Sequence, residues 1–434
     1  MTAMKKSARL GLFLCIPLLF SCSGGSRGQW ISFTVNDFIP TSNNQYVIPF
    51  NTQMKLNYYT NDDADDDFEN RLSSLYRQSV IRLHRIFDRH YSYFDDEKNL
   101  ITNVKTINDA YGTGEAVPCD DELYALLKSG YDMTIKTNGY FNFFMGNLTS
   151  FWDEILDRVN DLDPVNELDP YFSESQKEEM LRLRDAVPTI EEIGTMLEFD
   201  DERKTVVFHS IGDTFTSDGT LLPRENTDDP YRPVITSGGI AKGFATDLLK
   251  AELIENGYTH GYLNSGSSSI TSLSAPDYID KGYQKISIVD PRSKLYSQEV
   301  AVSITLDFDY ALSTSGNYTN GRSYIFTDPE TSKKIYRHHI IDPFTGECSQ
   351  EHASVSLVSK DLSNAELDAL STAFVNLPLE DGLKFRRELI EKYDCDLNLI
   401  FIDIDDADNL SITINEEFKD AVTIAKKEFN VAYA

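Results

Sequence analysis

Two side chains that stand four residues apart, Asp368 and Thr372, could together hold a metal ion. Ser363 and Glu366 form a capping box just upstream, which predicts that a helix begins there. Residues four apart on a helix share a face, so the carboxylate and the hydroxyl would lie side by side. Mg²⁺ prefers such hard oxygen ligands and takes phosphate oxygens beside them. The alternative is a surface aspartate with a buried threonine.

Two adjacent glycines, Gly238 and Gly239, precede a run with helical spacing that ends at Gly257. Because glycine has no Cβ, a ligand can approach the backbone closely there. A glycine turn that opens a helix leaves free N–H groups at the positive end of the helix dipole, which suits a phosphate. Lys242, in the first turn, would add a positive charge beside the same anion. The alternative is a packing turn with a solvated lysine.

A histidine and an aspartate, His339 and Asp342, lie in the sequence HIIDPFTG. A histidine with a pKa near neutrality could take a proton from an incoming hydroxyl group. Asp342 could orient His339, take part in the proton transfer, or cap the Asp-Pro turn. The alternative for His339 is a structural role, and we assign such a role to its neighbour His338.

Three small residues, Thr314, Ser315 and Gly316, open the sequence TSGNY. We expect them to form a tight turn. Their hydroxyl and amide groups would then reach phosphate or ribose oxygens of the same ligand.

The elements that must position these residues are helices and strands in mixed order. Residues 68–94 predict a long amphipathic helix, and residues 397–404 predict a strand. Residues 139–152 are rich in aromatic side chains, which indicates core packing rather than a wall for a flat ligand. Residues 153–203 are charged, and we interpret them as a surface insertion. No linker divides residues 31–434, so we treat them as one unit.

The N-terminus has the pattern of a targeting segment. Residues 1–21 combine basic residues with a short apolar run, which is typical of a signal peptide and too short to span a membrane. Cys22 follows a sequence like the bacterial lipobox, and residues 22–30 include a Ser/Gly tether. We therefore predict a lipidated Cys22 that anchors the protein to the extracytoplasmic side of a bacterial membrane. The alternative is a secretory signal that is cleaved nearby.

Composition limits the partners of the chain. Its 434 residues include 70 acidic and 40 basic residues, for a formal charge of −30. This balance argues against nucleic acid as a partner of the bulk surface, and an anionic ligand would need a local positive pocket or a metal. Outside the N-terminal segment the cysteines are Cys119, Cys348 and Cys395. They support neither a disulfide framework nor a zinc site, but they leave one disulfide open.

Four motifs follow one another along the chain: GGIAKG, TSGNY, HIIDPFTG and the helix with D-x-x-x-T. In this order they resemble the ApbE family, the FAD:protein FMN transferases, over most of residues 80–405. The resemblance implies an α+β fold with mixed, largely antiparallel sheets and flanking helices around one central FAD-binding cleft. It assigns residues 31–434 to a single flavin transferase domain.

The resemblance also implies an activity and further site residues. Members of the family split FAD at its pyrophosphate with Mg²⁺, join FMN through its phosphate to a threonine of a partner protein, and release AMP. The partner here would be an extracytoplasmic protein with a threonine flavinylation motif. The family further implies that the backbone carbonyls of Ala241 and Ser371 complete the Mg²⁺ shell. It places Tyr93 and Asn108 along the flavin or nucleotide pocket.

Departures from the family pattern keep alternatives open. Asn142, for example, stands where the family usually has an aspartate. A few relatives hydrolyse FAD to FMN and AMP, so the chain could be an FAD pyrophosphatase. It could also be a non-catalytic FAD-binding lipoprotein, although Asp368, Thr372 and His339 speak against that reading. We expect these three residues and Lys242 to converge on the diphosphate of one FAD molecule.

Overall fold

The computed structural model describes residues 28–61, 66–159, 169–212, 229–274, 283–293, 299–307, 309–317 and 323–434. The predicted signal peptide and the predicted lipidation site Cys22 lie outside these residues. The end of the predicted tether, residues 28–30, begins a strand instead, because its backbone pairs with a neighbouring strand. In the described part of the chain, no helix combines the length and apolar character needed to cross a membrane.

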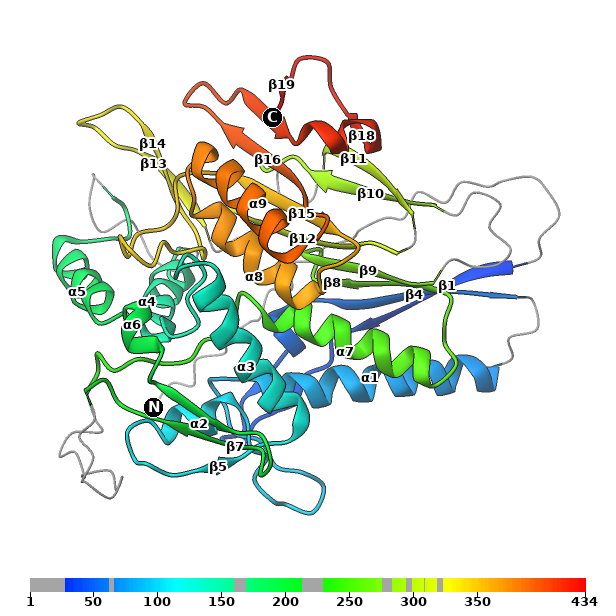
Figure 1. The fold of residues 1–434 in the computed structure, drawn as a ribbon, viewed down its shortest axis with the longest axis vertical. Helices are drawn as coiled ribbons and strands as arrows, with labels where there is room; N and C mark the ends of the chain where they lie inside the picture. The colour runs from blue at the N-terminus through cyan, green and yellow to red at the C-terminus, as the bar shows by residue number, and fades with distance from the viewer. Residues whose placement is uncertain are drawn as a thin grey trace, which may run out of the picture.

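A nine-stranded sheet forms the centre of the fold (Figure 1). Neighbouring strands run antiparallel except for β17 and β19, which are parallel. Together with the helices against it, this sheet confirms the predicted α+β class. Across the sheet the strands are β1 (Gly28–Val35), β4 (Met54–Asn61), β8 (Gly261–Ser265), β9 (Ser269–Ser274), β12 (Ala311–Gly316), β15 (Ser354–Ser359), β16 (Asn398–Ile404), β17 (Leu410–Ile414) and β19 (Asn430–Tyr433).

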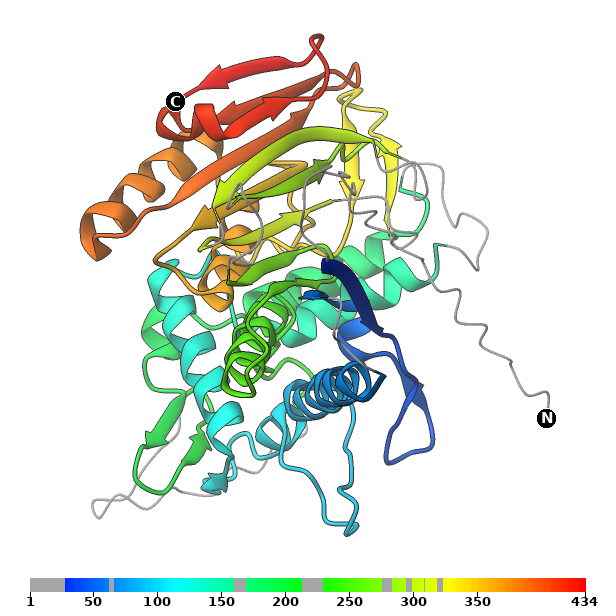
Figure 2. The ribbon, with the colours of Figure 1, turned by 90° about the vertical axis from the view of Figure 1, so that its right-hand side faces the viewer.

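The central sheet is covered by helices on one face and by a second sheet on part of the other (Figures 1 and 2). Strand β16 shows both layers, since alternate side chains of a strand point to opposite faces. Leu399 and Phe401 pack with the helices, whereas Ile400 and Ile402 pack with the second sheet. The helices are α1 (Asp66–Phe87), α3 (Asp121–Lys136), α7 (Ala241–Glu255), α8 (Asn364–Val375) and α9 (Leu379–Tyr393), and the second sheet contains β10 (Tyr283–Val289), β11 (Val300–Asp307) and β18 (Val422–Ile424).

Shorter elements complete the fold. The β5–β7–β6 sheet and helices α2, α4, α5 and α6 lie towards one end of the helical layer (Figure 1). Their bounds, with those of the remaining elements, are β2 (Ile39–Pro40), β3 (Tyr46–Val47), η1 (Pro49–Asn51), α2 (Val104–Asp109), β5 (Val117–Pro118), α4 (Gly146–Asp157), α5 (Glu174–Asp185), α6 (Ile190–Ile193), β6 (Leu197–Asp200), β7 (Thr205–Phe208), β13 (Tyr324–Thr327), β14 (Lys334–Arg337) and η2 (Glu416–Ala421).

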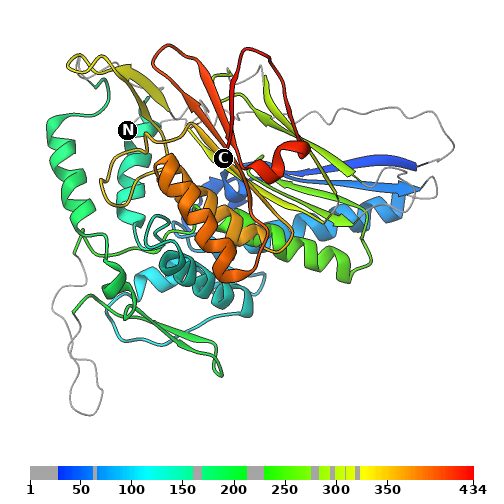
Figure 3. The same ribbon diagram turned by 45° about the horizontal axis from the view of Figure 1, so that its top comes forward.

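The charged segment 153–203 carries buried apolar side chains as well as its solvated ones. Phe172, Met180 and Leu183 are buried with Trp152 of α4 in a small separate cluster. The cluster lies beside the β13–β14 hairpin, where α4 and α5 stand next to each other (Figure 3). The described part of this segment therefore contributes to the core of the protein.

Helix α1 ends at Phe87, not at residue 94 as the apolar spacing predicted. Asp88 is buried, and its carboxylate accepts hydrogen bonds from the backbone N–H of His90 (2.7 Å) and from the hydroxyl of Tyr93. These local hydrogen bonds compete with the backbone hydrogen bonds of the helix, and the helix therefore ends at Phe87.

The three cysteines Cys119, Cys348 and Cys395 are free thiols, so the disulfide left open by the sequence is not formed among them. Burial raises the pKa of the Cys348 thiol to about 12, and it does the same for Cys119. Both thiols are therefore neutral at physiological pH and act as small apolar side chains.

Helices α7 and α8 cross in direct contact at Gly243. A Cβ placed on Gly243 would lie 2.1 Å from the backbone oxygen of Asn364 and 2.8 Å from the Cβ of Asp368. On the next turn of α7, Asp247 accepts hydrogen bonds from the N–H groups of Asn364 (3.1 Å) and Ala365 (2.9 Å). The start of α8 is thus fixed against α7 by backbone contact and by a carboxylate cap.

Replacing Gly243 by alanine should destabilise the fold by about 1–3 kcal/mol or more, because the added methyl group meets backbone that cannot move aside cheaply. Urea denaturation followed by circular dichroism would measure the loss. Gly194→Ala is the matched control, since its Cβ would lie 3.4 Å from the nearest atom, and it should shift stability by no more than about 0.5 kcal/mol. Equal stability of the two variants would contradict the crossing.

Candidate active site

Asp368 and Thr372 lie on α8 as the sequence predicted. The capping box is confirmed, since the Ser363 hydroxyl accepts from the N–H of Glu366 (3.2 Å) and the Glu366 carboxylate accepts from the N–H of Ser363 (3.1 Å). Asp368 lies in the second turn of α8 and points towards α7. The N–H of Gly243 in α7 donates a hydrogen bond to its carboxylate at 3.0 Å. The cap therefore sets the register in which the carboxylate meets α7.

Four hydroxyl groups gather beside Asp368, two from β12 and two from α8. The Ser313 hydroxyl lies 3.4 Å from Asp368 Oδ1 and 3.3 Å from Ser371 Oγ. The Ser315 hydroxyl lies 2.8 Å from Ser371 Oγ and 3.4 Å from Thr372 Oγ1. A strand and a helix thus present a continuous set of hard oxygen atoms to one place.

These oxygens fit Mg²⁺ by their chemistry. Asp368 is only 2% exposed, and its partners among the described residues are the Gly243 N–H and the Ser313 hydroxyl rather than a cationic side chain. A buried carboxylate without a countercharge is costly, and a divalent cation would offset that cost. No three His, Cys, Asp or Glu side chains of the described residues gather to hold a metal. The coordination shell of a metal bound to Asp368 would therefore be completed by hydroxyls, by phosphate oxygens and by the predicted carbonyls of Ala241 and Ser371.

The glycine turn lies against the same side of α8. A Cβ on Gly239 would lie 3.1 Å from Thr372 Oγ1 and 3.2 Å from the ring of Phe141. Lys242 is partly exposed, and its Nζ lies 3.4 Å from the Gly238 carbonyl. The structure therefore brings the glycine turn next to the Thr372 hydroxyl, while the Lys242 side chain lies back over the carbonyl of its own turn.

The predicted cradle of free N–H groups after Gly239 is wrong at three positions. The N–H groups of Ile240 and Ala241 donate to the carbonyl of Ser237 at 3.1 and 2.8 Å. The N–H of Gly243 donates to Asp368. The turn closes on its own backbone and on α8, so an anion at this point would depend on Lys242 and a metal ion for its countercharge.

The residues Thr314, Ser315 and Gly316 form the end of strand β12, not a tight turn. Their backbone pairs with β15, where Gly316 stands opposite Ser354. Side chains alternate along a strand, so Ser315 points to α8 while Thr314 points to the opposite face and lies 2.8 Å from the Ser356 hydroxyl. Of the two predicted hydroxyls, the structure brings only that of Ser315 to Asp368 and Thr372.

Asp342 caps the turn of HIIDPFTG, which was one of its three predicted roles. Its carboxylate accepts from the N–H of Phe344 (2.8 Å) and from the hydroxyl of Thr345 (3.0 Å). The N–H of Gly346 donates to the Asp342 carbonyl at 2.8 Å and closes the turn. Asp342 thus shapes the segment that carries His339.

The two adjacent histidines have different surroundings. His338 is buried, its Nε2 lies 2.7 Å from the Ser349 carbonyl, and its Nδ1 accepts from the Ile340 N–H at 3.2 Å. Burial lowers the pKa of His338 to about 3, so it is a neutral structural residue, as predicted. His339 is exposed, and its ring lies 6.4 Å from that of His338. Solvent and a partner molecule can therefore reach His339.

The turn that carries His339 is attached to the C-terminal end of α8. The side-chain amide of Asn376 donates to the Ile341 carbonyl (3.2 Å), and the Ser349 hydroxyl donates to the Val375 carbonyl (2.7 Å). Val375 lies three residues beyond Thr372 on the same helix. Thus α8 carries the carboxylate near its start and holds the histidine turn at its end.

Helix α4 and strand β14 clamp the other side of this turn. The indole N–H of Trp152 donates to the Gly346 carbonyl at 2.7 Å. Arg337 forms ion pairs with Asp169 (3.0 Å) and Glu347, and its guanidinium lies 5.1 Å from the Trp152 ring. A hydrogen bond, an ion pair and a cation–π contact therefore fix the C-terminal end of the turn.

Tyr93 and Asn108, which the resemblance placed along the ligand pocket, hold backbone and side-chain networks. The Tyr93 hydroxyl donates to Asp88 and lies 3.2 Å from His84 Nε2, and the residue is 1% exposed. Asn108 accepts from the Ile235 N–H (2.7 Å) and donates to the Ile235 carbonyl (3.0 Å). Asn108 thereby fixes the chain that leads into the glycine turn.

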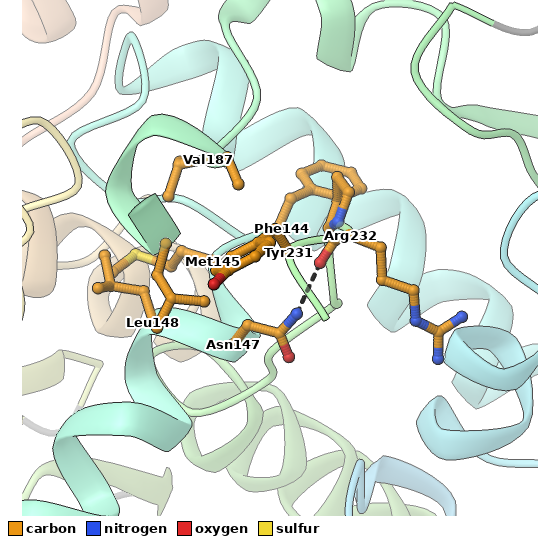
Figure 4. A pocket seen from close by; sticks show the side chains of 10 residues that line it. Phe144, Met145, Asn147, Leu148, Val187, Tyr231 and Arg232 are labelled. Carbon is orange, nitrogen blue, oxygen red and sulfur yellow. Dashed lines mark hydrogen bonds between the residues drawn. The ribbon is translucent and has the colours of Figure 1, made fainter. Parts of the chain in front are cut away.

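Two hollows in the described part of the molecule lie away from the predicted site residues. The one in Figure 4 holds about 10 Å³, room for a single water, and lies beside Tyr231. There the Asn147 amide donates to the Arg232 carbonyl at 2.7 Å, and the Arg232 guanidinium points away from the hollow (Figure 4). The other holds about 820 Å³ and runs along α1, with Arg82 in its wall. None of the predicted site residues lines either hollow.

Sequence reasoning missed three residues of the site: Ser313, Gly243 and Asp247. Ser313 could have been found from strand alternation, because it stands two residues before Ser315. Gly243 closes the GGIAKG motif, but only the crossing of two helices shows why a side chain is excluded there. Nothing in the local sequence marks Asp247 as a cap for another helix.

A family comparison identifies the group to which this arrangement belongs. A model of the ApbE family matches residues 50–395, which include every predicted site residue from Tyr93 to Thr372. The chain belongs to the ApbE family. No curated protein sequence matches it significantly.

Solved ApbE structures share the fold at low sequence identity. An ApbE protein from Thermotoga maritima has a TM-score of 0.60 and 20% identity, over 91% of this chain and 99% of that one. The flavin transferase ApbE from Vibrio cholerae has a TM-score of 0.56 and 16% identity, over 91% and 99%. The apo flavinyl transferase ApbE from Pseudomonas stutzeri has a TM-score of 0.56 and 17% identity, over 91% and 97%. The ApbE fold therefore spans nearly the whole chain.

The buried histidine His84 should make the fold sensitive to acid. Burial lowers its pKa to about 4, and its Nδ1 accepts from the Phe50 N–H at 3.2 Å, a bond that protonation would break. The unfolded chain, with a histidine pKa of about 6.5, takes up the proton first, so stability is lost as pH falls from about 6.5 to about 4. Wild type should lose on the order of 2–3 kcal/mol more than His84→Gln across this window, measured by urea denaturation. Parallel pH profiles would contradict this.

Proposed function

We propose that this chain is a flavin transferase that moves FMN from FAD to a threonine hydroxyl of an extracytoplasmic protein and releases AMP. The observation that carries the proposal is the set of oxygens from Asp368, Ser371, Thr372 and Ser315, assembled beside the glycine turn. Membership of the ApbE family supports it, as do the flavin transferase names of the Vibrio and Pseudomonas structures.

Phosphoryl transfer needs charge neutralisation and positioning more than covalent catalysis. Asp368, with Thr372 and the carbonyls of Ala241 and Ser371, would hold Mg²⁺, which would neutralise charge on the pyrophosphate oxygens. Lys242, beside the glycine turn, adds a positive charge for the same phosphates. This chain thus supplies a countercharge for FAD despite its strongly acidic composition.

The exposed His339 is the proposed general base. It takes the proton from the threonine hydroxyl as the oxygen attacks the phosphorus of the FMN half. The new O–P bond forms while the bond from that phosphorus to the bridging oxygen of the pyrophosphate breaks. AMP leaves with the electron pair of the broken bond. The Asp342 cap and the Asn376 amide keep the histidine turn in place during this step.

We also propose that the protein acts outside the cytoplasm. The predicted signal peptide, residues 1–21, and lipid attachment at Cys22 would tether the domain to a membrane through acyl chains. The acceptor would then be another protein exposed at that membrane surface.

Hydrolysis of FAD to FMN and AMP is the second candidate. Exposure of His339 favours it, because water can reach the same base as a threonine hydroxyl. The two activities share every proposed site residue and differ only in the acceptor.

The deciding experiment incubates the purified protein with FAD, Mg²⁺ and a flavoprotein that carries a threonine flavinylation motif. AMP release together with covalent flavin on the acceptor is the expected result. AMP without labelled acceptor would favour the hydrolase. If neither product forms, the protein would be a binding protein and the proposed function would be wrong.

Asp368→Ala should reduce AMP release at least about a hundredfold, because the buried carboxylate is the sole acidic ligand in the proposed set. It should also remove the rise in melting temperature that Mg²⁺ and FAD together give the wild type, which provides a readout independent of turnover. Asp420→Ala, at an exposed position of η2, is the control and should behave as wild type. Full activity of Asp368→Ala would refute the metal site.

A further inference from the structure

An exposed aromatic side chain, Phe344, lies on the turn that carries His339 and packs against the half-buried Tyr140. Phe344, the residue after Asp-Pro in this turn, is 52% exposed although it is a large apolar side chain. Its ring lies 4.9 Å from that of Tyr140 in an edge-to-face arrangement. Single exposed aromatic side chains are common on protein surfaces, but the place of Phe344 on the turn of the proposed general base makes it available to a molecule that approaches His339.

Three carboxylates act on this pair, and the nearest one, Asp342, accepts from the Phe344 N–H at 2.8 Å. Burial raises the pKa of Tyr140, and the negative charges of Asp342, Asp381 and Glu351 raise it further. Asp381 and Glu351 are exposed, so their charges face solvent next to the two rings. The local field is therefore negative, in keeping with the charge of −30 on the whole chain.

The aromatic pair and the histidine turn form one rigid unit. The Asn376 side-chain amide donates both to the Tyr140 carbonyl and to the Ile341 carbonyl, each at 3.2 Å. A molecule that contacts Phe344 and Tyr140 is therefore held in a fixed position relative to the turn of His339.

We propose that Phe344 and Tyr140, with Asp342, Asp381 and Glu351, are the docking patch for the acceptor protein. The patch takes a segment that has an apolar side chain next to a lysine or arginine, close to the threonine that receives FMN. This inference rests on the proposed function, and it adds the chemistry of the partner to it.

The charge of the patch decides between the two partners of the reaction. FAD carries a pyrophosphate, which three carboxylates repel, so the patch does not suit the dinucleotide. A cationic segment of a protein gains both the field and the aromatic contact. Docking here would also bring the threonine hydroxyl to the exposed His339 before the phosphoryl group moves.

The test measures binding of two fluorescent peptides without FAD, by fluorescence anisotropy on the full chain. Both contain one threonine and one leucine at the same positions; one has lysines as flanking residues and the other has glutamates. The lysine peptide should bind, and binding should weaken as salt rises from about 0.05 to 0.5 M, because screening shortens the range of the field. The glutamate peptide should bind at least about tenfold more weakly.

Variants locate the contact. Phe344→Ala should weaken the lysine peptide about tenfold, which is the effect of removing one aromatic hot-spot side chain. Asp381→Asn combined with Glu351→Gln should weaken it and flatten the salt dependence. Phe38→Ala is the matched control, since Phe38 is 57% exposed and lies on the wall of the separate hollow along α1, and it should bind as wild type.

Equal binding of the two peptides, no binding of either, or wild-type affinity in Phe344→Ala would overturn the docking patch. Circular dichroism of each variant establishes that it is folded. Because no turnover is required, a chain that binds the lysine peptide but releases no AMP would support the patch and contradict the proposed function.

Discussion

The candidate site depends on the close crossing of α7 and α8. Because Gly243 has no side chain, its N–H reaches the carboxylate of Asp368, and the two helices approach to backbone contact. This one contact brings together two motifs that are more than a hundred residues apart in the chain, the glycine turn before α7 and the aspartate of α8. The cap that Asp247 places on α8 holds the same geometry one turn further along. The glycine turn could not meet Asp368 and Thr372 if the helices stood apart.

Strand β12 provides the other half of the site, and its alternate side chains face the two layers of the core. Leu312 packs with the second sheet, while Ser313 and Ser315 turn towards α8. Serines in the middle of a buried sheet are costly unless they are hydrogen-bonded, and here both bond to side chains of α8. The polar cluster is thus built into the edge of the core, where Ser315, Thr372 and Lys242 remain partly exposed and the histidine turn at the end of α8 is open to solvent.

The sequence predicted the parts of this protein that local chemistry determines. The capping box at Ser363, the helix after the glycine turn and the face shared by Asp368 and Thr372 are all confirmed, because each depends on residues within one or two helical turns. The predictions that failed depend on distant partners. The N–H of Gly243 in the glycine turn bonds to Asp368, which lies 125 residues later, and Thr314 belongs to a strand whose neighbour comes about forty residues later. Spacing along the chain does not reveal such partners, and the family resemblance supplied the order of the motifs but not these bonds.

The clamp on the histidine turn has a consequence for how this protein can be altered. Trp152 and Arg337 lie on opposite sides of the charged stretch 153–203 in sequence order, and both hold residues at the end of the turn. Asp169, inside that stretch, neutralises Arg337 while the ring of Trp152 stacks near it. Excising the stretch would remove Asp169, one of the two carboxylates paired with the buried guanidinium of Arg337, and would weaken the clamp on the histidine turn. A minimal version of this protein must therefore retain it, whereas the exposed β13–β14 hairpin tip offers a safer place for tags or fusions.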